Sequence, residues 1–202
     1  MSDQATGLRE RKKQATHEAL VRAGLELFVE RGYEKTTLAE IADAAGVSPR
    51  TIFAYFPSKE DILFSKVQAM SEALGRALAE RPAGTDALSA LRAFILSSAH
   101  EKTELDHKLG RVIASDPTLM SHRRARLGQF QEVIAAAMAD DLGVGPDDRR
   151  PLIAAASLTA AFELLEQEDD CVPWRAATSE EIAAAIDPVL SFIRAGLEAL
   201  PG

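Results

Sequence analysis

The sequence predicts an all-α protein with two parts, a small N-terminal three-helix unit and a larger C-terminal helical part. Apolar residues recur at helical spacing along almost every segment of the 202 residues, whereas the alternation typical of strands is nowhere sustained. Hydrophobic residues make up 47% of the chain and charged residues 27%, as in an ordinary globular protein. We place the boundary between the parts near residue 70, ahead of a cluster of helix breakers, RPAGT, at 81–85.

The first two helices have clear end signals. The first is expected over about 10–31, and Gly32 is suited to end it in a left-handed conformation. Thr37 opens a short second helix as its N-cap, and Glu40 three residues later completes a capping box. A turn at Gly46 follows. The first helix has one apolar face, made by Leu20, Ala23, Leu27 and Phe28.

A third and a fourth helix are expected after this turn. Ser48 is a suitable N-cap for the third, and Pro49 suits its first helical position, where a missing N–H costs nothing. Ser58 opens a long fourth helix that we expect to run to about residue 80. Ile52 and Phe56 share one face of the third helix, and the fourth has an apolar stripe of Leu63, Val67, Met70, Leu74 and Leu78.

Five further helices are expected in the C-terminal part. The last begins with another capping box, Thr178 with Glu181, and contains Pro188, which should kink it. The segment 152–165 is apolar nearly all round, more than the core of one subunit requires. The expected ranges are 86–99, 105–115, 119–141, 147–168 and 179–200.

The charge of the chain is unevenly distributed. The chain has 23 Lys and Arg against 31 Asp and Glu, a formal net charge of −8. Residues 1–60 contain nine of each sign, so residues 61–202 carry the whole negative balance. A negatively charged partner is therefore directed toward the N-terminal end, where Arg9, Arg11, Lys12 and Lys13 form a basic cluster.

The expected compartment is the cytoplasm. The single cysteine, Cys171, cannot form an internal disulfide, and the N-terminal segment has no apolar stretch after its charges. No stretch approaches the roughly 18 to 20 uninterrupted apolar residues of a membrane helix.

The second and third helices have the form of a helix-turn-helix motif, at about residues 37–56. In this motif the second helix enters the DNA major groove, so its back must be apolar and its N-terminal residues small and polar. Ile52 and Phe56 can supply the apolar back. Arg50 is the best candidate for reading a base, because its planar fork matches the two acceptors on a guanine edge.

The stretch LFVERGYEKTTLAEIADAAGVSPRTIFAYFPSKEDIL, residues 27–63, closely resembles the DNA-binding signature of TetR-family transcriptional regulators. With flanking helices the resemblance covers about residues 10–70, a third of the chain. It implies a homodimer whose subunits each have a helix-turn-helix DNA-binding domain at 10–70, preceded by a flexible arm at 1–9. It also implies a ligand-binding and dimerisation domain at 71–202, and a repressor that a ligand releases from DNA.

The resemblance also implies roles for individual residues. Thr37 and Ser48 cap helices and touch phosphates, while Tyr55 and Lys59 hold the DNA backbone. Phe53 stands where many members have a tyrosine, and without the hydroxyl it can pack but cannot bond to a phosphate. The candidate DNA-binding residues are Arg11, Lys12, Lys13, Thr36, Thr37, Ser48, Pro49, Arg50, Thr51, Phe53, Tyr55 and Lys59.

A small-molecule effector is expected in the C-terminal part. Residues 110–130 faintly resemble family members whose ligands are acyl-CoA-like, and by resemblance the last two long helices form the dimer interface. Arginines there could pair with an anionic head, and aromatic or methionine side chains could line an apolar pocket. The candidate ligand-binding residues are Phe94, Arg111, Met120, Arg123, Phe130, Phe162 and Trp174, with Arg124 and Met138 as further members.

An alternative is a helical small-molecule-binding protein or enzyme whose DNA-binding unit is vestigial. No nucleophile elbow or phosphate-binding loop is visible, so the sequence predicts no enzyme and no cofactor. His100, Glu104 and His107 could share a helical face, but no fourth ligand accompanies them and we expect no metal site. Whether the regulator represses or activates stays open at this point.

Overall fold

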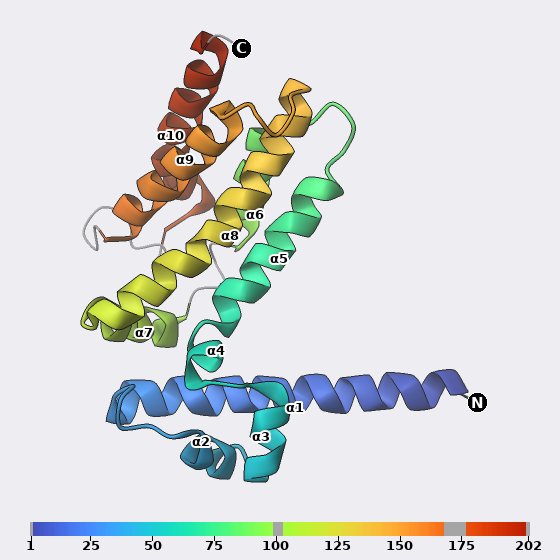
Figure 1. The fold of residues 1–202 in the computed structure, drawn as a ribbon, viewed down its shortest axis with the longest axis vertical. Coiled ribbons are helices and arrows are strands. Elements are labelled where there is room, and N and C mark those ends of the chain that lie inside the picture. The colour runs from blue at the N-terminus through green and yellow to red at the C-terminus, as the bar shows by residue number, and fades with distance from the viewer. Residues whose placement is uncertain (1, 99–102, 168–176, 201–202) are drawn as a thin grey trace. The chain divides into compact units, whose positions relative to one another are not determined.

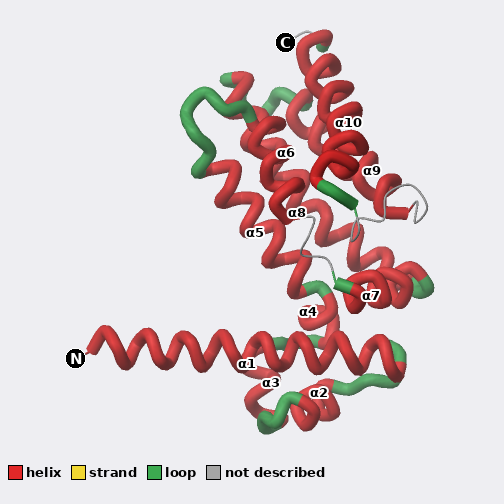
Figure 2. Tube along the Cα trace, turned by 180° about the vertical axis from the view of Figure 1, so that it is seen from behind, coloured by secondary structure: helices red, strands yellow, loops and turns green. Residues whose placement is uncertain are grey.

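A computed structural model describes residues 2–98, 103–167 and 177–200, and the regular secondary structure in these ranges is entirely α-helical (Figures 1 and 2). The predicted all-α class is confirmed. Two compact units can be distinguished, one made of residues 1–67 and 104–120 and the other of residues 68–103 and 121–202. The chain passes from one unit to the other at three points, and two of them lie within helices, α5 (Ser65–Ala79) and α8 (Pro117–Leu142).

The first unit is organised around its long first helix. The helix α1 packs against α2, α4 and α7, and an apolar core lies between them. Leu20, Phe28, Ile41, Ile52 and Ile62 are fully buried in that core. The helices of this unit are α1 (Ser2–Arg31), α2 (Leu38–Ala44), α3 (Pro49–Tyr55), α4 (Lys59–Leu63) and α7 (Glu104–Ala114).

The predicted capping residues act as expected. The Thr37 hydroxyl accepts a hydrogen bond from the Glu40 N–H, and the Glu40 carboxylate accepts one from the Thr37 N–H at 2.9 Å, which completes the capping box. The hydrogen bonds that the Thr37 N–H and hydroxyl donate to this carboxylate lower the pKa of Glu40. The Ser48 hydroxyl likewise accepts from the Thr51 N–H at 3.1 Å at the start of α3. The helix α1 ends at Gly32, whose φ of +89° is the predicted left-handed conformation.

Two predicted helix boundaries in this unit are wrong. The helix α1 starts at Ser2 instead of near residue 10, so residues 2–9, expected as an arm, extend the helix. This stretch contains no proline to stop it. The predicted fourth helix is in fact two, α4 and α5, separated at Phe64 (φ −101°, ψ 10°). Phe64 is fully buried, and the Ser65 hydroxyl donates to the Ile62 carbonyl beside the break.

Residues 104–120 belong to the first unit. The sequence had suggested a single boundary near residue 70, with all later residues in the C-terminal part. Leu109 and Ile113 of α7 and Leu119 of α8 are buried in the same core as α1. An ion pair between Lys66 and Asp106, 2.7 Å long, adds a polar tie. Helical periodicity could locate α7, but its partner depends on tertiary packing.

The second unit is a helical bundle in which α9 and α10 lie side by side (Figure 1). Its core includes Leu74, Leu91, Met138, Leu158 and Ile186. No helix within the described ranges is both long and apolar enough to cross a membrane. The further helices of this unit are α6 (Ala87–Ser98), α9 (Arg150–Gln167) and α10 (Ser179–Ala199).

The C-terminal helix boundaries agree closely with expectation, apart from α9. This helix begins at Arg150, three residues after the predicted start, because the Asp148 carboxylate accepts a hydrogen bond from the Arg150 N–H at 2.9 Å. The predicted Thr178 capping box at the start of α10 is present. Pro188 lies inside α10, and the kink expected there stays a prediction.

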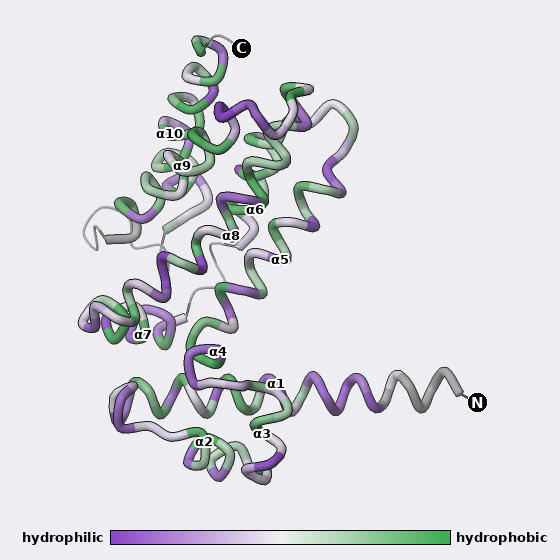
Figure 3. Tube along the Cα trace, in the orientation of Figure 1, coloured by the Kyte–Doolittle hydropathy of each residue, from purple (hydrophilic) through white to green (hydrophobic). Residues whose placement is uncertain are grey.

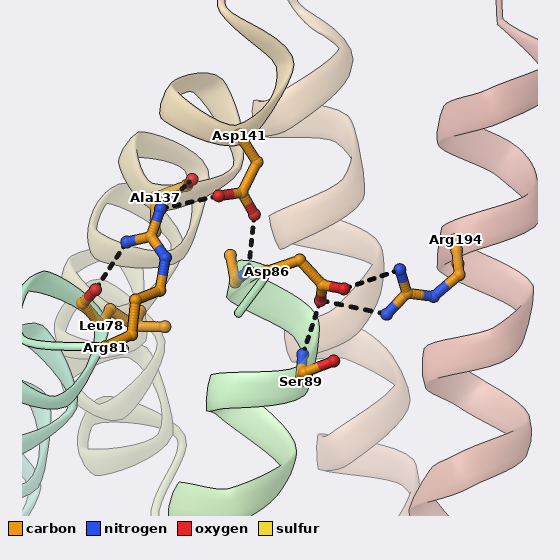
Figure 4. Close-up of polar contacts among 8 residues, drawn as sticks. Leu78, Arg81, Asp86, Ser89, Ala137, Asp141 and Arg194 are labelled. Carbon is orange, nitrogen blue, oxygen red and sulfur yellow. Dashed lines mark hydrogen bonds and ion pairs between the residues drawn. The ribbon is translucent and has the colours of Figure 1, made fainter. Parts of the chain in front are cut away.

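One end of the bundle is fastened by two linked groups of charged residues (Figure 4). Asp86, just before α6, accepts two hydrogen bonds of 3.0 Å from Arg194 of α10. Arg81, after α5, donates to Asp141 of α8 at 2.7 Å. The same Asp141 carboxylate accepts from the Ala87 N–H, which connects the two groups. These hydrogen bonds therefore connect α5, α6, α8 and α10 through residues that are far apart in the sequence.

The Asp86 pair makes the stability of this unit depend on pH. Hydrogen bonds from Arg194 lower the pKa of Asp86 from its ordinary 3.8 to about 2. A carboxyl group whose pKa is lowered on folding stabilises the fold at pH values above its pKa in the unfolded state. This stabilisation is lost as the pH falls from about 4 to about 2. Because both side chains are more than a third exposed, we expect a contribution of at most about 1 kcal/mol.

Urea unfolding at pH 7 and at pH 3 measures this contribution. Asp86→Asn should lower the unfolding midpoint at pH 7 and should show a smaller drop between the two pH values than the parent. Asp147→Asn, at an exposed residue with no hydrogen bond or ion pair to the described residues, serves as the matched control. Equal pH responses of parent and Asp86→Asn would contradict the assignment.

Candidate DNA-binding surface and ligand pocket

The helix α3 has a buried back and an exposed front. Ile52 is fully buried and Phe56 is 4% exposed, so both face the core of the first unit. Pro49, Arg50 and Phe53 are exposed. The structure thus produces the division of faces that a groove-entering helix needs.

Arg50 is the leading cationic side chain of this face. It is exposed and makes no hydrogen bond or ion pair with the described residues, so its five N–H donors are available to a partner. Phe53, one turn further, is 60% exposed. An apolar ring is therefore exposed on the same face of α3 as Arg50, and a contact of Phe53 with DNA stays a prediction.

Hydroxyl groups flank the start of α3. The Ser48 and Thr51 hydroxyls lie 2.8 Å apart and hydrogen-bond to each other. Both retain lone pairs and can also turn a proton toward an acceptor such as a phosphate. Thr37 is exposed at the start of α2, and Tyr55 is half-buried against the core.

Thr36 does not belong to the exposed surface, contrary to expectation. It is 1% exposed, and its hydroxyl donates to the Gly32 carbonyl at 2.9 Å, at the end of α1. This side chain fixes the loop between α1 and α2 and cannot reach DNA without unfolding it.

Lys59 also has a partner within the protein. Its ammonium donates to the Tyr33 carbonyl at 2.9 Å and lies 4.2 Å from the centre of the Tyr33 ring. Burial raises the pKa of Tyr33, and the neighbouring Glu60 carboxylate raises it further, so the phenol is neutral at physiological pH. Lys59 thus ties α4 to the loop after α1, a role the sequence did not predict.

The basic cluster near the N-terminus lies on α1. Arg11, Lys12 and Lys13 are exposed, and Lys13 makes a weak 3.8 Å ion pair with Glu10. Figure 3 shows this stretch of α1 as hydrophilic, whereas hydrophilic and hydrophobic residues alternate in the C-terminal half of the helix. The three cations therefore lie along a helix and not on an extended arm.

The second unit contains an apolar pocket of about 180 Å³. Side chains from α5, α6, α8 and α9 line it, among them Phe94, Phe130 and Phe162. Its polar lining residues are Ser98, Arg123, Thr159 and Glu163. A pocket with apolar walls and a few polar groups is typical of a small-molecule site.

The structure brings together four of the seven predicted ligand residues: Phe94, Arg123, Phe130 and Phe162 all line this pocket. Arg111 and Met120 do not, because they belong to the first unit. Met138, a further candidate, is buried in the core of the second unit. Trp174 and His100 lie outside the described residues.

Sequence reasoning missed Thr159 and Glu163 as pocket residues. A signal was present, because they interrupt the apolar segment 152–165 at a spacing of four, which places both on one face of a helix. Phe162 lies beside Glu163 and lines the same pocket.

A second apolar surface lies on α9 and α10. Leu152, Ile153 and Leu164 of α9 are 52–64% exposed, and Phe192 of α10 is 73% exposed. Ser157, Ala161, Pro188 and Phe192 line a shallow groove of about 300 Å³ on these two helices. Exposed apolar side chains on this scale are typical of an interface.

Comparison with known proteins decides the family. Residues 20–65 match the model of the bacterial regulatory proteins of the tetR family, and residues 85–198 match the MftR C-terminal domain. The chain belongs to the TetR family. It is 34% identical to the transcriptional regulator TcmR of Streptomyces glaucescens, over 93% of this chain and 87% of TcmR.

Solved structures show the same fold. NalD, the secondary repressor of the MexAB-OprM efflux pump in Pseudomonas aeruginosa, has a TM-score of 0.61 at 22% identity, covering 88% of this chain and 96% of NalD. Salmonella enterica GusR has a TM-score of 0.61 at 19% identity, covering 91% and 96%. This TetR-family member is a DNA-binding transcriptional regulator.

Arg50 and Lys59 should respond differently to alanine substitution. Arg50→Ala should leave thermal stability unchanged and relax base preference at one position per half-site by about tenfold or more, since one bidentate base contact is lost. Lys59→Ala should lower the melting temperature and weaken all duplexes alike, because it loosens the loop at Tyr33. Binding to a panel of single-base operator variants, together with thermal melts, measures both. A uniform loss across the panel for Arg50→Ala would contradict its role.

Proposed function

We propose that this TetR-family regulator is a dimeric repressor that leaves a near-palindromic operator when a small apolar or amphipathic ligand binds its second unit. The recognition helix carries the proposal: α3 exposes Arg50 over a back face that Ile52 buries completely. The pocket in the second unit supports the ligand response. NalD, which shares the fold, is itself a repressor.

Each group on the DNA-binding surface has a role that fits its chemistry. Arg50 reads a guanine edge, and Pro49 and Phe53 make apolar contacts with thymine methyl groups. Thr37, Ser48, Thr51 and Tyr55 bond to phosphate oxygens, which fixes the register on the duplex. Arg11, Lys12 and Lys13 add sequence-independent attraction to the backbone. We assign residues 10–70 to DNA binding, with residues 104–120 packed into the same unit, and the remainder of 71–202 to ligand binding and dimerisation.

The dimer is formed by α9 and α10. Their exposed apolar side chains would be covered by the same surface of a second copy, giving a four-helix interface. Two recognition helices about 34 to 36 Å apart, one turn of duplex, then enter successive major grooves. The operator is therefore expected to repeat its half-site with that spacing.

The ligand acts through the two helices that enter both units. α5 contributes Met70 and Leu74 to the pocket, and α8 contributes Arg123. Four residues before Arg123, Leu119 of the same helix is buried in the core of the first unit. A ligand that favours a different position of these helices lowers the affinity for DNA. By linkage, DNA lowers the affinity for the ligand by the same factor.

The pocket binds a ligand without transforming it. The sequence suggested an acyl-CoA-like effector, and the apolar walls around Phe94, Phe130 and Phe162 suit a hydrophobic ligand of this size class. Because Arg111 lies in the other unit, Arg123 alone of the expected cations meets the pocket. The regulator works in the cytoplasm, where its operator is.

Selection of the purified full-length protein against random duplex DNA tests this function. We expect enrichment of a near-palindrome at near-physiological salt. A salt titration on the enriched site should then show the steep loss of affinity that phosphate contacts produce. Arg50→Ala protein is the control, because it should enrich a site with one position relaxed. A folded, dimeric protein that enriches no sequence would support the binding-module or enzyme alternative instead.

Replacement of Phe192 tests the dimer. Phe192→Arg should weaken self-association at least about tenfold, because a large aromatic anchor is lost and a charge enters an apolar interface. Leu142→Arg places the same charge at an exposed leucine of α8 and serves as the control. Sedimentation equilibrium measures both variants. A Phe192→Arg protein that dimerises as well as the parent would place the interface elsewhere.

A further inference from the structure

We propose that the pocket of the second unit selects an uncharged aromatic molecule that carries a hydroxyl group, such as a phenol. The proposal rests on the proposed function in one respect, that this pocket is the effector site. It differs from the acyl-CoA-like class, whose members are anions.

The size and walls of the pocket suit an aromatic ring system. Its volume is about 180 Å³, close to the roughly 150 Å³ of an engineered apolar cavity that binds benzene. Phe94 of α6, Phe130 of α8 and Phe162 of α9 come from three different helices to line it. Aromatic pairs in offset or edge-to-face contact gain stabilisation beyond the burial of their area, so three phenylalanine rings suit an aromatic ligand.

The α9 wall offers hydrogen-bond acceptors. Thr159 is 9% exposed, and its hydroxyl donates to the Ala155 carbonyl at 2.9 Å. With its proton engaged, the Thr159 oxygen can only accept from a ligand. Glu163 follows one turn later and lines the same pocket. Its ionised carboxylate can only accept hydrogen bonds. A ligand that contacts this wall must therefore donate a hydrogen bond.

The charges of the pocket favour a neutral ligand. Arg123 of α8 and Glu163 of α9 both line it, and the other lining residues within the described part of the chain are uncharged. Because both residues line one small pocket, an anion attracted to Arg123 is repelled by Glu163, and a cation attracted to Glu163 is repelled by Arg123. A hydroxyl group avoids both penalties, because it donates to Glu163 and its oxygen accepts from a guanidinium N–H.

Calorimetric titration of the full-length protein without DNA tests the selection. Three probes share one ring system: β-naphthol, which is uncharged and donates; naphthalene, which has no donor; and β-naphthoate, which is an anion. We expect β-naphthol to bind at least about tenfold more tightly than either other probe, the value of one hydrogen bond to a charged group. Tighter or equal binding of β-naphthoate, or binding of no probe, overturns the proposal.

The substitution Glu163→Gln tests the named wall. It should weaken the binding of β-naphthol about tenfold and strengthen the binding of β-naphthoate, because the negative charge that repels the anion is gone while Arg123 stays. Glu180→Gln makes the same chemical change at an exposed residue outside the pocket and should alter neither affinity. Unchanged affinities in Glu163→Gln overturn the proposal. The preference of the parent protein is measured without any variant, so a misfolded variant leaves the test intact.

Operator binding separates this proposal from the function on which it rests. A protein that binds its operator but prefers the anion retains the repressor function and loses only the ligand class. A protein that prefers β-naphthol but binds no operator retains the ligand class and loses the repressor function.

Discussion

The first unit depends on the close approach of α1 and α4 at Gly24. A Cβ atom at this position would lie 2.6 Å from Cγ2 of Ile62, a distance that no side chain tolerates without displacement. This contact fixes α4 against α1, and Lys59 at the start of α4 can then reach the Tyr33 carbonyl. The loop after α1 is held from the other side by Thr36. Because α2 follows this loop directly, the placement of α2 and α3 depends on a glycine in α1.

The sequence predicted what local chemistry determines. Thr37, Ser48 and Gly32 act within a few residues of themselves, so their roles could be inferred from spacing alone, and the structure confirms them. The spacing of Ile52 and Phe56 identified the buried face of α3 for the same reason, because apolar residues at helical spacing are enough to predict which face of a helix is buried.

Tertiary contacts were beyond that reasoning. Thr36 and Lys59 have the residue types of DNA contacts, yet their partners lie within the protein at Gly32 and Tyr33. Arg111 and Arg123 are both cations in one predicted ligand region, yet only Arg123 lines the pocket. The break at Phe64 was hidden because the apolar stripe continues through it, and only full burial of that ring shows why the helix stops.

A ligand can change DNA binding only if its affinity differs between two states of the protein. The helices α5 and α8, which contain residues of both units, can provide two such states. A ligand shifts an equilibrium only by its difference in affinity between two states, so tight binding alone releases nothing. Residues on α5 and α8 line the pocket, and both helices also have residues in the first unit. On α8 only one turn separates Leu119, packed in the first core, from Arg123 at the pocket. A helical turn is stiff, so the position of Leu119 constrains the position of Arg123. The proposed ligand, whose hydroxyl engages Arg123 and Glu163, can leave α8 where Leu119 holds it or can shift the helix. We expect a change in DNA binding only if the helix shifts.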